Sequence, residues 1–267
     1  MVLLVAKLVG TPCLIVLVSL VARRFGPQGA GLLAGLPLSS GPVAGLLVAA
    51  EGAPFGRTVA LGILLGLVGA QAFIVAYAFA SPRTGWPLSA IAGFAGFGAV
   101  GTLSYVLAPG PLLVVPVVLL GLVAIRLLLG PMDPGVRPGS RTDHGWPDLL
   151  LRAAIAATIV VALTSAAPLL GPRLSGILAP VPVATAILSV FTQRTSGPAA
   201  VRNLLRGVAG GAYSFWAFFT VLYLVLTHLP TLAAFGGATT VALAIQAVRL
   251  AVGRSRDAAP VVAVPRG

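Results

Sequence analysis

Long apolar runs separated by short polar connections form the pattern of this chain. Each run has about the 20 residues that an α-helix needs to cross the hydrocarbon core of a bilayer. The pattern predicts an all-α integral membrane protein with about nine transmembrane helices, at residues 2–22, 29–50, 57–80, 87–108, 110–130, 149–170, 173–193, 203–228 and 231–252. The one long polar connection, 131–148, is rich in proline and glycine, which predicts a linker between two halves.

The composition agrees with a membrane protein. The chain of 267 residues is 58% hydrophobic and 8% charged, whereas about a quarter of the residues of a soluble domain are charged. The single cysteine, Cys13, excludes a disulfide within the chain and a cysteine metal cluster. Although the net charge is +12, the sequence has no polar domain that could carry a nucleic-acid-binding surface. Nucleic acid is therefore not an expected partner.

The distribution of basic residues predicts the orientation. With nine spans, Lys7, Arg57 and Arg173 fall on one side of the membrane and the other fourteen basic residues, all arginines, fall on the opposite side. Cytoplasmic loops carry the excess of basic residues, so the N-terminus is predicted outside and the C-terminus inside. The heavy use of arginine, alanine, glycine and proline favours a GC-rich bacterial genome. The predicted location is therefore the bacterial cytoplasmic (inner) membrane.

An internal repeat appears when the sequence is shifted by 145 residues. Between residues 26–78 and 171–223, 12 of 53 positions are identical. The matches include residues that do not replace one another as membrane filler: Gly26/Gly171, Pro27/Pro172, Gly31/Gly176, Pro37/Pro182, Gly52/Gly197, Arg57/Arg202, Gly62/Gly207 and Gly66/Gly211. The last two pairs form Gly-x-x-x-Gly motifs, which pack helices closely. Both halves are therefore expected to pack this helix in the same way.

The repeat unit has four helices, because the same shift lays span 87–108 on span 231–252. The helix at 110–130 has no partner, and an odd spacer turns the second unit upside down in the membrane. The sequence predicts two inverted-topology four-helix repeats joined by an unpaired fifth helix. The parts are residues 1–108 (first repeat), 109–148 (fifth helix and cytoplasmic linker), 149–253 (inverted repeat) and 254–267 (cytoplasmic tail).

Two of the predicted helices, 29–50 and 173–193, are interrupted by proline at matched positions. Proline removes a backbone donor, and in lipid the freed carbonyl is tolerated only against protein or a water-filled cavity. A crossing but broken helix fits the basic residues best; if both segments were re-entrant, the count of fourteen against three would become eleven against six. The re-entrant alternative stays open.

Interrupted helices in two inverted halves indicate the binding site of a transporter that works by alternating access. The candidate substrate-binding residues are Pro37, Ser39, Ser40, Pro42, Gln71, Pro180, Pro182, Thr185 and Ser189. The alternative is that the hydroxyl groups and the Gln71 amide only satisfy neighbouring helices. Glu51, which directly follows the span 29–50 while the other acidic residues fall in the linker and the tail, is the candidate for a coupling proton. Its alternative role is that of an interfacial carboxylate near Arg57.

The repeated segments "GPQGAGLLAGLP" (26–37) and "GPRLSGILAPVP" (171–182) resemble small bacterial inner-membrane proteins of the GlpM-like type, which are four-helix units with a similar Gly-Pro and Gly-Leu-Leu-Ala-Gly pattern. The two-unit layout also resembles that of drug/metabolite transporters. Those have ten helices in two inverted fives, whereas nine are predicted here. Neither resemblance implies a particular substrate.

An enzyme is not expected, because the chain has no paired-carboxylate motif, no His-x-x-His, no Gly-x-Ser-x-Gly and no P-loop. The linker segment "RTDHGWPD" (141–148) matches no established metal-binding spacing, so neither a metal nor a cofactor is expected. The predicted function is a secondary transporter or exporter of a small neutral, amphipathic or lipid-linked solute. The alternative is a non-transporting scaffold or accessory subunit of envelope polysaccharide or lipid synthesis. The expected partners are membrane lipids and that solute, and a homodimer is left open.

Overall fold

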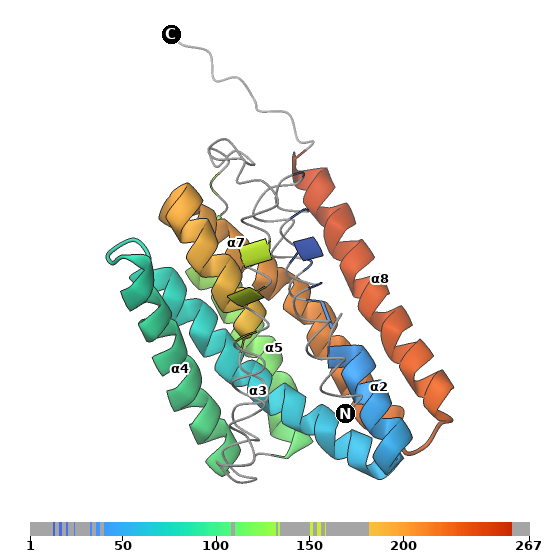
Figure 1. Cartoon of the computed structure of the whole chain (residues 1–267). Helices are drawn as coiled ribbons and strands as arrows, with labels where there is room; N and C mark the ends of the chain where they lie inside the picture. The colour runs from blue at the N-terminus through green and yellow to red at the C-terminus, as the bar shows by residue number, and fades with distance from the viewer. Residues whose placement is uncertain are drawn as a thin grey trace.

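The computed structural model of the chain describes residues 40–107, 110–131 and 182–257, together with the single positions 13, 16, 17, 20, 24, 33, 36, 37, 133, 150, 151, 154, 155 and 158. All regular elements in this part of the chain are α-helices: α2 Ser40–Glu51, α3 Ala53–Ala80, α4 Trp86–Leu107, α5 Pro111–Leu128, α7 Val183–Val225 and α8 Thr231–Asp257. They form a bundle in which α4 and α8 lie at opposite edges (Figure 1).

Five of these helices, α3, α4, α5, α7 and α8, are long and apolar enough to cross a membrane. They make the chain a multi-pass membrane protein. Large apolar side chains also cover the outside of the bundle; Leu112 is 90% exposed and Leu232 is 88% exposed. A soluble protein rarely exposes so much apolar surface, whereas lipid chains cover it without cost.

The predicted spans 87–108, 110–130 and 231–252 lie close to α4, α5 and α8. Proline at the first turns of α3 and α5 explains two of the observed starts, since its missing N–H is not needed there. The predicted spans 2–22 and 149–170 fall mostly outside the described residues. The count of nine spans therefore stays a prediction.

One predicted connection is shorter than expected. Residues 194–202 were expected to join two helices as a loop; two helices are present, but within Val183–Val225, the segment labelled α7, they meet at a kink at Gly197. The chain changes direction at Gly197 alone, and Pro198 starts the next turn directly. Proline fits the first position of a helix, so no linker residues are needed. The connection before α3 is short as well: α3 begins at Ala53 directly after Gly52, and not at residue 57 as predicted.

Small residues let α3 and α4 approach closely. A Cβ atom on Gly69 would lie 3.1 Å from the Cα atom of Gly101, and one on Gly93 would lie 2.7 Å from the Phe73 ring. The first glycine of the predicted Gly-x-x-x-Gly motif in α3 does not make such a close contact. Gly62 is exposed with open space around it, while its repeat partner Gly207 is buried. The second glycines of the two motifs, Gly66 and Gly211, are both buried, so the motifs differ at their first glycine, and α4 crosses α3 about two turns after Gly62.

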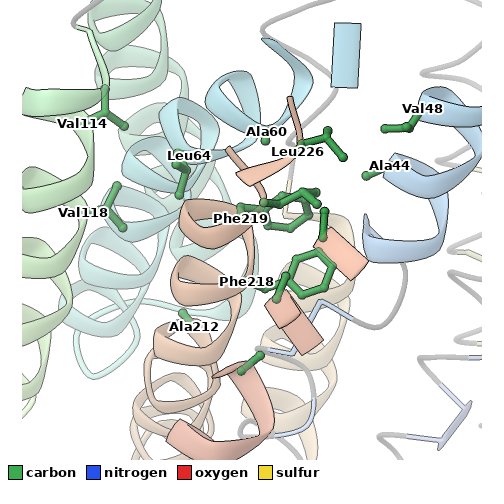
Figure 2. Close-up of a cluster of buried hydrophobic side chains, with 14 of the residues drawn as sticks. Ala44, Val48, Ala60, Leu64, Val114, Val118, Ala212, Phe218, Phe219 and Leu226 are labelled. Atoms are coloured by element: carbon green, nitrogen blue, oxygen red, sulfur yellow. The ribbon is translucent and has the colours of Figure 1, made fainter. Parts of the chain in front are cut away.

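Buried side chains gather in two large clusters. The first core cluster joins α2, α3, α5, α7 and α8 and contains Ala44, Val48, Ala60, Leu64, Val114, Val118, Leu122, Ala212, Phe218, Phe219, Leu222, Leu226, Ala234, Ala238 and Ala242 (Figure 2). The second core cluster joins α3, α4, α5 and α7 and contains Phe73, Ile74, Tyr77, Ala78, Phe97, Ile125, Leu129, Ala186, Val201, Leu205, Val208 and Ala209. Helix α5 contributes to both.

Candidate functional site

Helices begin next to both of the predicted proline breaks. The backbone bends at Leu36 and Pro37, and α2 starts at Ser40. Pro182 caps the start of α7, and its carbonyl accepts a hydrogen bond from the backbone N–H of Ala186 at 2.8 Å. The 12 residues of α2 extend over only about 18 Å at 1.5 Å per residue. They are too short to cross the ~30 Å hydrocarbon core without the segment before them.

A second pair of breaks follows, at Gly52 and Gly197. Gly52 separates α2 from α3 with φ 87° and ψ 170°, and Gly197 divides α7 with φ 82° and ψ 179°. Positive φ combined with ψ near 180° is a backbone region that glycine alone occupies readily. The two residues are 145 positions apart in the sequence. The same residue therefore makes the same sharp bend at matched positions of the predicted repeat.

Residues 145 apart also recur in the two core clusters. Phe73, Ile74 and Tyr77 of α3 belong to the second cluster, and their counterparts Phe218, Phe219 and Leu222 of α7 belong to the first. The correspondence continues with Ala60/Leu205, Leu64/Ala209 and Phe97/Ala242, whose members lie in opposite clusters. Each cluster therefore holds the first turns of one long helix and the last turns of the other.

The crossing points of neighbouring helices correspond as well. Gly69 of α3 faces Gly101 of α4. At the positions 145 residues later, the Ser214 hydroxyl of α7 donates a hydrogen bond of 3.1 Å to Gln246 Oε1 of α8. Both polar side chains are buried. In the first half, two glycines allow the helices to approach at this crossing. In the second half, a hydrogen bond joins the helices there.

Helix α5 lies between α3 and α7 and is bonded to both. The amide nitrogen Nε2 of Gln71 on α3 donates to the Val118 carbonyl at 2.8 Å. The indole nitrogen Nε1 of Trp216 on α7 donates to the Val115 carbonyl at 3.0 Å. Gln71 and Trp216 are 145 residues apart, and the two acceptors flank Pro116, the proline inside α5. Gln71, a candidate substrate ligand, thus has a protein partner.

The other candidate binding residues divide between α2 and α7. Ser40 begins α2, where Pro42 is exposed. On α7, Thr185 and Ser189 are buried, and the Ser189 hydroxyl donates to the Thr185 carbonyl of its own helix at 2.7 Å. Among the described residues, no hydrogen bond joins the two groups. Ser39 and Pro180 lie outside the described residues, and so does the segment 141–148.

Glu51, the candidate coupling residue, is exposed at the last position of α2. Arg57 does not pair with it: the Arg57 guanidinium donates to the Tyr223 hydroxyl at 3.2 Å and lies over the Tyr223 ring, 4.5 Å from its centre. Within the described part of the chain, no group of three histidine, cysteine or acidic residues is placed to hold a metal ion.

Polar groups that the sequence did not single out gather at the end of the bundle where α3 turns into α4. The Gln193 amide nitrogen donates to the carbonyls of Ser81 and Thr84 at 3.2 and 3.0 Å, and to the Ser89 hydroxyl at 3.3 Å. The Arg194 guanidinium lies over the Trp86 ring. Spacing along one helix cannot reveal such contacts, because they join residues more than a hundred positions apart.

No protein-family model, curated protein or solved structure matches this chain.

Proposed function

We propose that this protein is a secondary transporter or exporter of the bacterial cytoplasmic membrane. It moves a small neutral, amphipathic or lipid-linked solute by alternating access between two inverted four-helix units, with nine helices in all. The observation that carries the proposal is the pair of glycine breaks at Gly52 and Gly197, 145 residues apart and nearly identical in φ and ψ. Equal bends at equal positions support a duplicated unit, and inverted duplicates are the architecture of alternating access.

The exchange of partners between the halves supports the same proposal. Ala44 of α2 packs in the first core cluster with Phe218 of α7, and Ala186 of α7 packs in the second with Phe73 of α3. Each helix start thus shares a buried cluster with the long helix of the other half, while α2 also packs against α3 of its own half. A rocking movement that loosens one of these contacts can tighten its counterpart, which is what two equivalent end states require.

Helix α5 is the natural pivot in this scheme. It packs against both α3 and α7 and accepts one hydrogen bond from each, at Val118 and Val115. The solute would bind where the interrupted helices begin, near Ser40 and Thr185. Among the described residues, none of 40–50 and 182–193 is charged, which favours a neutral or amphipathic solute over a multiply charged ion.

Contacts between the halves agree with the predicted orientation. Gln193 bonds to the α3–α4 turn, so the arginine-rich segment after it lies at the same end as Arg83. Arg57 near the start of α3 contacts Tyr223 near the end of α7, so these two helix ends lie together at the opposite end of the bundle. The arginine-rich end would be cytoplasmic under the positive-inside rule.

Side-specific thiol labelling tests the proposal. Single cysteines at Ser40, Ala184 and Thr185 are introduced into a chain that carries Cys13→Ser, and each is exposed to an impermeant thiol reagent from either face of the membrane. Leu120→Cys on the exposed face of α5 is the control that lipid should protect. We expect labelling from both faces at the three sites, at rates that a transported solute changes.

A scaffold is the second candidate, and one observation favours it: Gln71 and Ser189 find their hydrogen-bond partners within the protein. Protection of all three cysteines from both faces would mean that the helix starts are packed in protein. That result would refute alternating access and leave the scaffold.

A further inference from the structure

Three arginines from three helices converge near the predicted cytoplasmic end of the bundle. Arg126 comes from the last turn of α5, Arg206 from α7 and Arg249 from α8. Nη1 of Arg206 donates to the Arg126 carbonyl at 3.1 Å. The Arg249 guanidinium lies over the Tyr213 ring, 4.4 Å from its centre. The three charges are close enough to repel one another.

This group of arginines has no acidic counterpart among the described residues. Arg206 and Arg249 are partly buried, and the Arg249 Nε atom is enclosed without a hydrogen-bond partner. Unpaired charge that is removed from water is costly. Orientation in the membrane needs only basic residues in the loops. It does not explain guanidinium groups drawn together between helices.

The arginines also depart from the repeat. At the positions 145 residues earlier, Arg206 corresponds to Leu61, Tyr213 to Val68 and Arg249 to Ser104. The first half therefore carries no charge at any of these places.

We infer that Arg126, Arg206 and Arg249, together with Tyr213, form a binding site for a phosphate group. Guanidinium groups match phosphate oxygens with paired hydrogen bonds and keep their charge at any physiological pH. Three positive charges exceed what a single carboxylate neutralises, and a phosphate offers more acceptor oxygens, with one negative charge as a diester and up to two as a monoester. The phosphate can belong to a phospholipid headgroup or to a soluble phosphorylated solute. The site does not depend on alternating access.

The test measures thermal unfolding of the full-length protein in neutral detergent. Inorganic phosphate or pyrophosphate is added in one arm, with chloride at equal ionic strength as the reference. In the other arm, nanodiscs of phosphatidylglycerol are compared with nanodiscs of phosphatidylcholine. We expect stabilisation of the wild type in at least one arm; the arm that responds identifies the source of the phosphate.

Arg126→Gln is the decisive variant, because the Arg126 side chain is exposed and its carbonyl stays available to Arg206. We expect its affinity for the phosphate compound to fall about tenfold, as for the loss of one charge-assisted contact. Without ligand it should be at least as stable as the wild type, since a like-charge repulsion has been removed. Arg249→Lys, which keeps the charge but loses the planar fork, should bind more weakly than the wild type.

The matched control is Arg83→Gln. Arg83 lies at the same end, is exposed, and is satisfied by the Phe79 carbonyl at 2.9 Å. It should respond like the wild type. Equal responses of the Arg126 and Arg83 variants would overturn the inference, as would a wild type that responds in neither arm. An Arg126 variant that is less stable without ligand would show a structural role instead.

Discussion

Replacement of Gly121 by alanine is expected to destabilise the protein through one side chain, that of Gln71. A Cβ atom on Gly121 would overlap Oε1 of Gln71 and lie 3.0 Å from its Cδ atom. The overlap forces the amide to move. The amide nitrogen donates to the Val118 carbonyl of α5 at 2.8 Å, so the amide cannot move away without losing this hydrogen bond. The alanine therefore forces the amide out and breaks the hydrogen bond that ties α3 to α5.

The size of the effect follows from two contributions. Overpacking of a filled site costs about 1–3 kcal/mol, and a side-chain hydrogen bond between membrane helices contributes about 0.6–1.7 kcal/mol. Gly121→Ala should therefore reduce the free energy of unfolding by about 2–5 kcal/mol. In a Gln71→Ala background the space is empty, and alanine gains up to about 1 kcal/mol over glycine as a helix former. The coupling energy between the two sites is then at least about 2 kcal/mol.

Unfolding in mixed micelles of increasing dodecyl sulfate content, followed by the helical circular dichroism signal, measures this coupling. The four proteins of the cycle are the wild type, Gly121→Ala, Gln71→Ala and the double variant. Gly62→Ala is the control on α3, where an added Cβ atom meets nothing within 4 Å. If Gly121→Ala costs the same in both backgrounds, Gln71 does not occupy the space beside Gly121 and the argument fails.

Two further substitutions test the packing and the breaks with the same titration. Gly93→Ala would place a Cβ atom 2.7 Å from the buried Phe73 ring, and we expect a loss of about 1–3 kcal/mol; a loss within experimental error would mean that α4 and α3 are not in this contact. Gly52→Ala and Gly197→Ala should each cost about 1–3 kcal/mol, because their backbone region excludes a side chain. Unequal costs, with one variant unaffected, would contradict the equivalence of the two bends.

Much of the helical framework could be predicted from the sequence, because length and polarity decide it. Apolar runs bounded by Trp86-Pro87 and by Pro111 gave the ends of α4 and α5 within a few residues. The start of α7 directly after Pro182 fits the expectation of a proline there, since proline is tolerated at a helix start and not in its interior. At Gly197 the predicted pair of helices is present, but the connection between them is one residue and not a loop. A Gly-Pro pair is compatible with a loop or with a sharp bend between two helices, and only packing decides between them.

The contacts between helices could not be predicted in the same way. A run of apolar residues in a membrane helix does not reveal which face meets protein and which meets lipid. The pairing of Ser214 with Gln246 therefore could not be foreseen, although both side chains are buried. Arg249 was counted only as a marker of orientation. The hydrogen-bond partner of Gln71 is a backbone carbonyl of α5, so it could not be recognised before the position of α5 was known.

The composition of the two core clusters has a consequence for biosynthesis. Each cluster contains residues of both halves, so neither can be completed when the ribosome has delivered only the first 130 residues. The second cluster must wait for α7, and the first must wait for α7 and α8. Helices inserted early therefore stay incompletely packed until synthesis is nearly finished. A chain cut in the polar linker can regain this packing only when both fragments are made in the same membrane.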